Sequence, residues 1–399
     1  MSRADDLLFE PLQLPCGGVL KNRIAKSAMS DSLGDGTGHP TEAQARLYRR
    51  WAEGGLALSI VGEVQGGPGF AEKPGNLVLN EAADLSRFET LARAGAENGA
   101  QLWLQLGHAG AMAYPPTSTP RGPSALDLPG LRCAELARDE IRALPAQFAR
   151  TARLARRAGF GGVQLHAAHG FLLSQFLSPL FNKRTDGYGG ILANRMRLLL
   201  ETVEAVRAAV GPDFPVGLKL NSTDRLEGGF AEADALAVIA ALDKTGIDLI
   251  DISGGTYFPG ARSASDSGGG GPYFTEFAKR ARRVTGKPLM ATGGFKTRTQ
   301  AEAAVAGGAV DVVGLARALV IEPSLPDLWR AGEKPEPAFP RFADPPEGGV
   351  TAWYTLRLTE IAEGREPSPS GDLRRALAVY EARDRARTET WLRHFPAAA

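Results

Sequence analysis

Short apolar runs alternate with longer amphipathic segments along most of the chain, and the amphipathic segments carry Ala, Leu, Arg and Glu at helical spacing. The apolar runs cover residues 22–29, 56–62, 101–107, 161–166, 216–221, 248–253, 287–294 and 311–316. The helical segments cover residues 41–53, 84–98, 139–158, 191–210, 232–245, 274–285 and 298–307. Eight strand-like runs separated by helices predict an α/β fold, a closed (β/α)8 TIM barrel. An open doubly wound sheet is the alternative, but no convincing glycine-rich turn follows an early strand.

The segment before the first predicted strand has a different pattern. Residues 7–21 hold two short apolar stretches on either side of Gly17-Gly18, a pair suited to a tight turn. They predict a β-hairpin that plugs the lower end of the barrel.

The chain changes character again after residue 330. A proline-rich stretch comes first, and two helical segments, 351–364 and 371–394, follow it. We expect residues 1–330 to form the barrel domain. We expect residues 331–399 to form a helical extension that packs on the barrel or on a neighbouring subunit, which favours a homo-oligomer.

Composition and charge narrow the class of partner. Lys and Arg total 46 and Asp and Glu total 45, so the formal net charge of +1 provides no field that attracts nucleic acid or an anionic membrane. The two cysteines, Cys16 and Cys133, are too few for a disulfide framework or a four-thiolate cluster. The N-terminal residues lack the pattern of a signal peptide, and no apolar run is long enough to span a membrane. We therefore expect a cytoplasmic protein that acts on a small molecule.

Polar side chains collect where the predicted strands end, which is where βα barrels carry their catalytic groups. Two of the five histidines, His166 and His169, flank a tight turn after the fourth strand. Both imidazoles could donate a hydrogen bond to one oxygen atom of a ligand. A hydrogen-bonded structural role is the ordinary alternative for a histidine. A zinc site is not expected, because no third ligand stands at a recognisable spacing and the HExxH pattern is absent.

The last two predicted strands end in small residues, Gly293-Gly294 and the segment 314–317, with Arg317 adding a positive charge. Backbone N–H groups and an arginine in this position suit a phosphate group, although ordinary tight turns use glycine equally often. Lys219 lies within the fifth predicted strand. If its side chain points into the barrel lumen, it requires an anion there.

Several segments together resemble the old yellow enzyme family of flavin-dependent ene-reductases. The resemblance runs in order through about residues 7–330, and its most specific part is the FLSPLFNKRTDGYGG block. The matching segments are residues 20–30, 105–110, 166–190, 194–195 and 314–319. The resemblance implies an FMN-binding barrel that is reduced by NADPH or NADH.

The resemblance also implies roles for individual residues. Those expected at the flavin ring are Ala28, Met29 and Ser30 on its face, Gly62 through its backbone, Gln105 at the pyrimidine edge and Lys219 beside N1. Those expected at the phosphate are Gly294, Ala316 and Arg317. His166 and His169 match the pair that binds the carbonyl oxygen of the substrate. The Arg184, Asp186, Tyr188 and Asn194 side chains are expected to order a loop, with Asn194 and Arg195 at the start of the next helix.

The family reaction implied is reduction of an α,β-unsaturated carbonyl compound. Reduced flavin delivers hydride to Cβ while the histidines polarise the carbonyl, and a proton reaches Cα from the opposite face. Many members carry a tyrosine as the proton donor where this chain has Phe171, which cannot donate a proton. Ser30 replaces the more usual threonine or cysteine, and Lys219 replaces arginine. Water or Tyr114, in the loop after the third strand, are the alternative proton sources.

Three other functions stay open at this stage. Phe171 also fits a subgroup that acts on a different acceptor, by oxidation or nitro-group reduction. A phosphate-binding aldolase or isomerase could use Lys219 as a Schiff-base nucleophile. A non-catalytic flavin carrier or sensor is the third, but the paired histidines argue against it. The sequence does not distinguish NADH from NADPH.

Overall fold

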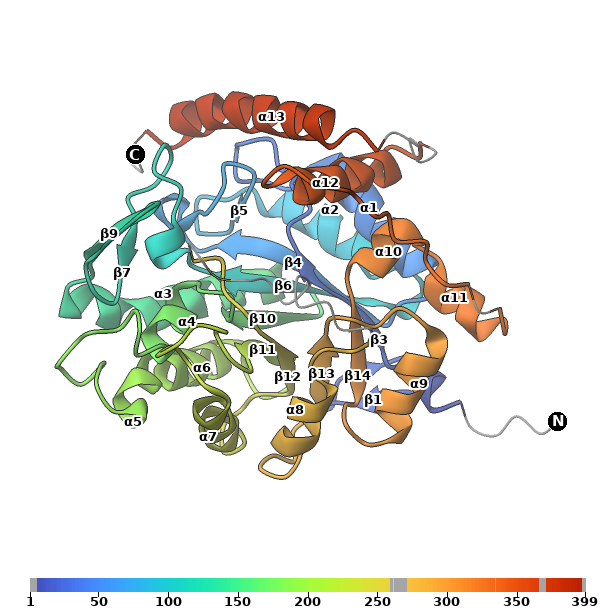
Figure 1. Cartoon of the computed structure of the whole chain (residues 1–399), viewed down its shortest axis with the longest axis horizontal. Helices are drawn as coiled ribbons and strands as arrows, with labels where there is room; N and C mark the ends of the chain where they lie inside the picture. The colour runs from blue at the N-terminus through green and yellow to red at the C-terminus, as the bar shows by residue number, and fades with distance from the viewer. Residues whose placement is uncertain (1–5, 259–260, 262–270, 334, 366–370, 397–399) are drawn as a thin grey trace.

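The computed structural model of the chain describes residues 6–258, 261, 271–333, 335–365 and 371–396. Its central feature is a closed barrel of parallel strands (Figure 1). Each strand pairs with its neighbour in parallel, and the last pairs with the first, so the predicted barrel is confirmed. The barrel strands are β3 (Ile24–Met29), β4 (Leu58–Gln65), β6 (Gln101–Gly107), β10 (Gly162–Ala167), β11 (Val216–Asn221), β12 (Leu249–Ser253), β13 (Leu289–Thr292) and β14 (Val312–Leu315).

Amphipathic helices surround these strands and bury their apolar faces against them. Two of them begin with reciprocal side-chain caps, Thr41 with Gln44 and Thr297 with Gln300. The longer helices are α1 (Glu42–Glu53), α2 (Leu85–Gly95), α3 (Arg138–Arg157), α6 (Arg197–Val210), α7 (Glu232–Leu242), α8 (Thr275–Ala281) and α9 (Arg298–Ala306). The shorter ones are α4 (Leu172–Leu177), α5 (Leu192–Arg195), α10 (Arg317–Ile321) and α11 (Leu325–Arg330). The segment predicted as one helix over 191–210 is therefore two helices, α5 and α6, which meet at Met196.

The N-terminal hairpin forms as expected. Strands β1 (Leu12–Gln13) and β2 (Val19–Leu20) pair in antiparallel fashion, and Gly17 takes a positive φ of 89° in the turn between them. Leu14 and Leu20 pack with apolar side chains from the amino ends of the barrel strands, including Trp103 and Leu249. The hairpin thereby closes the end of the barrel opposite to the strand carboxyl ends.

Four short strands were not predicted. Strand β5 (Leu77–Val78) pairs in parallel with the end of β4. The loop after β6 folds into a small sheet of β7 (Arg121–Gly122), β8 (Leu126–Leu128) and β9 (Leu131–Glu135). Two- to five-residue strands give too few alternating positions for a periodic signal.

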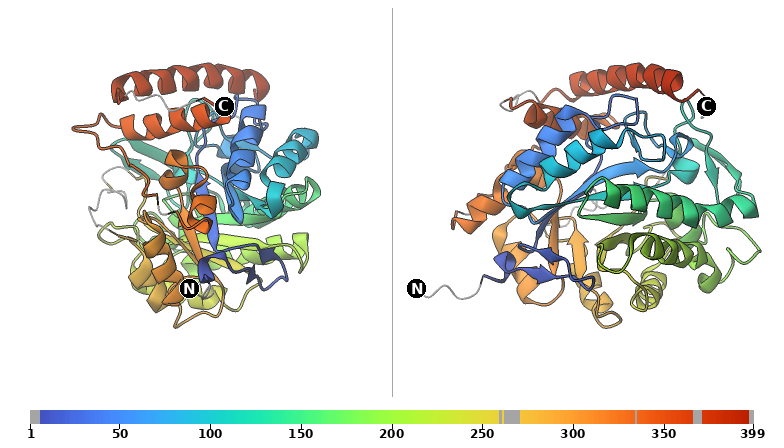
Figure 2. Two further views of the ribbon diagram at one scale, coloured as in Figure 1. Left: turned by 90° about the vertical axis from the view of Figure 1, so that its right-hand side faces the viewer. Right: turned by 180° about the vertical axis from the view of Figure 1, so that it is seen from behind.

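Two C-terminal helices, α12 (Gly349–Ala362) and α13 (Leu373–His394), lie side by side against the barrel of the same chain (Figures 1 and 2). Helix α12 packs on α1 and α10. Helix α13 is fixed to the loop after β3, because the Arg387 guanidinium donates to the backbone and side-chain oxygens of Ser32. Farther along, Trp391 packs with Ala71, in the loop after β4, and with Val78 of β5. Helix α13 therefore covers loops at the carboxyl ends of two strands. None of the helices that the structure describes combines the length and apolar character needed to cross a bilayer.

Candidate active site at the carboxyl ends of the strands

The two histidines lie together at the carboxyl end of β10. Their ring centroids are 5.3 Å apart and the ring planes are nearly perpendicular. His169 takes a positive φ of 60°, an uncommon conformation for a residue with a side chain. Its backbone N–H donates to Asn221 Oδ1 at 3.1 Å, which helps hold that conformation. The turn thus brings both imidazoles to one place, as the spacing predicted.

Both imidazoles are neutral at physiological pH. Burial lowers the pKa of His169 to about 3, with the Lys219 charge adding to the effect, and burial lowers the pKa of His166 well below its usual range. His166 Nδ1 accepts from the Ala168 N–H at 3.3 Å, so its proton resides on Nε2. His169 Nε2 lies 2.8 Å from Ser253 Oγ, and if the hydroxyl donates, the His169 proton resides on Nδ1. Each ring then has one N–H group to donate to a ligand.

Two aromatic side chains border the histidine pair. Phe171 is only 4% exposed, and its ring centroid lies 4.4 Å from that of His166. Tyr257, in the loop after β12, lies on the other side, with its ring centroid 5.7 Å from that of His169 and 6.3 Å from that of Phe171. Two imidazoles, one apolar ring and one phenol therefore form a compact group.

Lys219 points into the lumen, and the anion that this position requires is Asp251. Lys219 Nζ lies 3.0 Å from Asp251 Oδ2, and the two side chains are 2% and 0% exposed. Lys219 and Asp251 are register neighbours on adjacent strands, so their side chains share the inner face. Asp251 was not predicted as part of the site.

The Asp251 carboxylate organises a chain of hydrogen bonds across the lumen. Gln105 donates to Gln164 at 2.7 Å, and Gln164 donates to Asp251 at 3.2 Å. Thr292 donates to the other carboxylate oxygen at 2.7 Å and in turn lies 2.6 Å from the Ser27 hydroxyl. Because Thr292 uses its only proton on Asp251, Ser27 is the donor in the second contact. These contacts hold the Gln105 and Lys219 side chains in place inside the barrel.

Ser30 does not act alone at the end of β3. Its hydroxyl donates to Glu63 Oε2 at 2.7 Å, and Asn76 donates to the same oxygen at 2.8 Å. Glu63 has a positive φ of 61°, and its withdrawal from water together with the nearby Glu72 carboxylate raises its pKa well above the usual range. No role for Glu63 could be predicted from the sequence, because its partners, Ser30 and Asn76, come from two other segments.

Gly62 and Met29 meet closely where β3 and β4 run side by side. A Cβ on Gly62 would lie 2.8 Å from the Met29 backbone oxygen, so only glycine fits there. Met29 itself pairs with Val61 after an irregularity in the strand register, and it is half-buried, as is Ala28 beside it. The end of β3, at Ala28 and Met29, is therefore packed closely against β4.

The expected phosphate end combines two glycines with an arginine. Gly294 has a φ of 82°, and a Cβ there would lie 2.2 Å from the Gly271 oxygen, so the turn itself requires glycine. Ala316 leads directly into α10, and the Arg317 guanidinium lies 5.7 Å from the Tyr354 ring centroid. Among the described residues, Arg317 has no carboxylate within ion-pair distance. Strands β13 and β14, which lead to Gly294 and Arg317, are neighbours in the barrel, and a guanidinium without a carboxylate near a glycine turn fits a phosphate group.

Tyr114, one alternative proton source, lies elsewhere in the loop after β6. Its ring centroid is 5.5 Å from Lys73 Nζ, and its backbone N–H donates to Ala71. No ring contact joins it to either histidine in the part of the chain that the structure describes.

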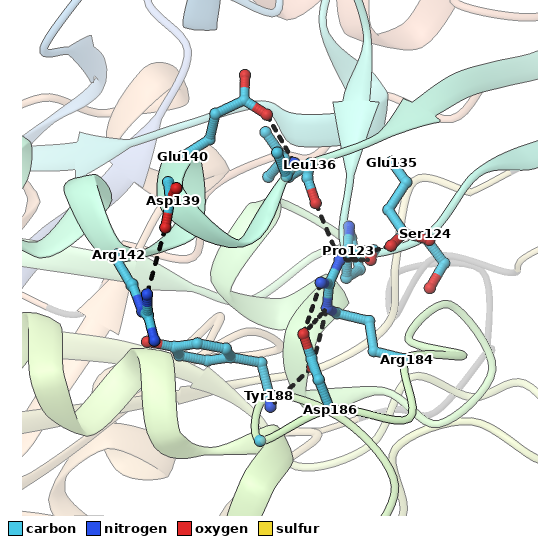
Figure 3. A network of polar contacts seen from close by, with 12 residues as sticks. Pro123, Ser124, Glu135, Leu136, Asp139, Glu140, Arg142, Arg184, Asp186 and Tyr188 are labelled. Atoms are coloured by element: carbon cyan, nitrogen blue, oxygen red, sulfur yellow. Dashed lines mark hydrogen bonds and ion pairs between the residues drawn. The ribbon is translucent and has the colours of Figure 1, made fainter.

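The RTDGYGG block orders a loop, as predicted (Figure 3). Arg184 makes hydrogen bonds to both Asp186 oxygens, at 2.6–3.1 Å, and to the backbone oxygens of Pro123 and Leu136. These contacts fasten the loop after α4 to the small sheet formed by β7, β8 and β9. At the next helix, the buried Arg195 side chain forms an ion pair with Asp234 at 3.1 Å.

The fold and site together define a βα-barrel enzyme with its ligand site at the carboxyl ends of the strands. Comparison with known proteins agrees. The sequence matches the NADH:flavin oxidoreductase / NADH oxidase family over residues 7–334. The chain belongs to this family, which confirms the resemblance to old yellow enzyme.

Three similar proteins illustrate the relationship. The chain is 36% identical to the NADH-dependent flavin oxidoreductase iliE of Neonectria sp. (strain DH2), over 86% of this chain and 49% of that protein, so it spans about half the length of this relative. It is 35% identical to the protein of the same name from Hypocrea jecorina (strain QM6a), over 79% of this chain and 87% of that protein. The solved structure of morphinone reductase matches with a TM-score of 0.73 and 26% identity, over 85% of this chain and 93% of that one.

The residues at the strand ends fit FMN, the cofactor that the family implies. The lumen presents the Gln105 amide and the Lys219 ammonium. Gly62 lets β4 approach the Met29 backbone of β3 closely, and Arg317 offers a guanidinium that has no carboxylate partner among the described residues. By contrast, no three His, Cys, Asp or Glu side chains within the described residues come together as a metal ion requires.

Proposed function

We propose that this protein is an FMN-dependent oxidoreductase that uses NADH to reduce the C=C bond of an α,β-unsaturated carbonyl compound. The observation that carries the proposal is the pair of neutral imidazoles, 5.3 Å apart, at the mouth of a barrel with a polar lumen. The family supplies the cofactor class, and the names of two relatives support NADH as the reductant.

Each part of the site has a task in this reaction. Bound FMN, once reduced, supplies the hydride. His166 and His169 donate two hydrogen bonds to the carbonyl oxygen, which polarises the enone and stabilises the negative charge that develops on that oxygen. Gln105 and Lys219 bind the polar edge of the flavin, and Arg317 with the Gly294 turn binds its phosphate.

The same geometry weakens the aldolase alternative. A Schiff-base nucleophile must be an uncharged amine, whereas Lys219 is held in a buried ion pair with Asp251. A flavin oxidoreductase that acts on another acceptor remains the second candidate, because Phe171 provides no proton.

The test is reoxidation of the photoreduced protein by 2-cyclohexenone in the absence of oxygen. Photoreduction avoids any effect of the variants on nicotinamide binding. We expect reoxidation to slow by about 100-fold or more in a His166→Ala/His169→Ala variant, which has no side-chain donor at either position, since removal of one oxyanion donor alone has this effect. His39→Ala is the matched control, because the ring contacts of His39 are with Phe88 and His394 and not with either member of the pair. Unchanged enone turnover in the double variant would refute the proposed role of the histidines.

A further inference from the structure

The loop after β12 places the phenol of Tyr257 beside the histidine pair. None of the tasks assigned above to the site residues involves this phenol. The Tyr257 ring centroid lies 5.7 Å from that of His169 and 6.3 Å from that of Phe171. Among the described residues, Tyr257 is the tyrosine whose ring contacts this group. Tyr257 is 62% exposed, whereas Phe171 is buried. The Tyr257 ring therefore borders the place where the two histidines would bind a ligand.

Contacts on both sides fix the backbone of this loop. The Tyr257 N–H donates to the His169 carbonyl oxygen at 3.1 Å, and Thr256 forms a β-bridge with His169. On the next residue, the Phe258 ring stacks on that of Phe181 with centroids 3.6 Å apart. The backbone that carries Tyr257 is thus tied to the residue that would bind the substrate.

The chemistry of C=C reduction requires an acid at this place. Hydride adds to Cβ, and the electron pair of the π bond must then form a C–H bond at Cα with a proton from a donor. Phe171 cannot donate, because a phenyl ring has no exchangeable proton. Tyr114 lies next to Lys73, and no ring contact joins it to the histidines in the described part of the chain. Tyr257 follows β12, whereas Phe171 follows β10, so Tyr257 would approach the same substrate from another side of the site.

We propose that Tyr257 is the catalytic proton donor, in place of the tyrosine that other members carry where this chain has Phe171. The phenol O–H bond breaks as the C–H bond forms at Cα, and the resulting phenolate takes up a proton from water. This inference rests on the proposed function, since it requires an enone bound by His166 and His169.

The test compares the oxidative half-reaction of the photoreduced, FMN-loaded protein in single variants. We expect Tyr257→Phe to slow reoxidation by 2-cyclohexenone by about 100-fold or more, the usual contribution of a general acid, while NADH reduces the flavin at the wild-type rate. Tyr188→Phe is the matched control. It removes a phenol hydroxyl from a buried residue outside the site. The Tyr188 hydroxyl donates to Glu201 Oε2 of α6 at 3.0 Å.

A second variant separates chemistry from structure. A Phe171→Tyr/Tyr257→Phe protein returns a phenol to the histidine pair from the other side, so we expect it to recover at least about tenfold of the lost rate. A merely structural role of Tyr257 predicts no recovery. Reoxidation of Tyr257→Phe within about threefold of wild type would overturn the proposal, as would a large loss in Tyr114→Phe alone. If wild-type protein binds flavin but no enone reoxidises it, the proposed function fails first.

Discussion

The buried ion pair between Lys219 and Asp251 allows a quantitative test of the lumen. Replacement of Asp251 by asparagine keeps the shape of the side chain but removes its charge. At 3.0 Å and an effective dielectric constant of about 20, the lost attraction is about 5.5 kcal/mol. Removal of one partner from a buried pair typically destabilises a protein by about 3–5 kcal/mol, because the other charge stays buried without compensation. We expect a loss within this range for flavin-free Asp251→Asn.

The assay is denaturant unfolding of the flavin-free protein, with the free energy of unfolding obtained from the midpoint and the slope. Asp213→Asn is the matched control, since Asp213 is 67% exposed and pairs with Arg156 at 3.0 Å on the surface. Its loss should stay below about 1 kcal/mol. The double variant Lys219→Met/Asp251→Asn should recover most of the loss. Equal effects of Asp251→Asn and Asp213→Asn would refute the reasoning.

Three further predictions concern other parts of the molecule. Burial lowers the pKa of Lys26 from 10.5 to about 7, so between these pH values the unfolded chain binds one proton more than the folded chain, and the free energy of unfolding rises with pH. Lys26→Met should remove this pH dependence and, at pH 7, raise the free energy of unfolding by up to about 4–5 kcal/mol. A variant that is less stable than wild type in denaturant unfolding would contradict this. Arg387→Ala should loosen α13 from Ser32 and speed amide hydrogen exchange in residues 373–394 by about ten- to hundredfold, and unchanged exchange there would argue against the tether. In the FMN-loaded protein, Asp251→Asn should raise the reduction potential of the flavin, because the Lys219 charge is no longer neutralised and stabilises the reduced flavin more strongly. The potential is measured by titration in equilibrium with a redox dye, and a lower potential would contradict the placement of Lys219 beside the flavin.

The strands and the hairpin could be predicted because their signals are local. Each barrel strand is buried on both faces and therefore reads as an apolar run, and Gly17 marks the hairpin turn. The proximity of His166 and His169 could be predicted equally well, since a spacing of three residues across a turn brings their side chains together. The small sheet after β6 was not, because its strands are too short to show a period.

The partners of the site residues could not be read from the sequence. Asp251 neutralises Lys219 only because the register of β11 and β12 sets them opposite each other, 32 residues apart in the chain. Glu63 accepts a hydrogen bond from the Ser30 hydroxyl of another strand, and its backbone takes a positive φ that its residue type does not indicate. Tyr257 lies in a loop, four residues beyond the end of β12, and its contact with His169 depends on how that loop folds back. Long-range register and loop paths are the information that local patterns lack.

The most direct test of the central claim is the visible absorption spectrum of the purified protein under anaerobic conditions. The account predicts a yellow protein with bound FMN whose flavin absorbance is lost on addition of NADH and returns on addition of 2-cyclohexenone. A colourless protein that takes up no added FMN would contradict the cofactor assignment. A protein that NADH bleaches but that only oxygen or another acceptor reoxidises would contradict the enone as substrate.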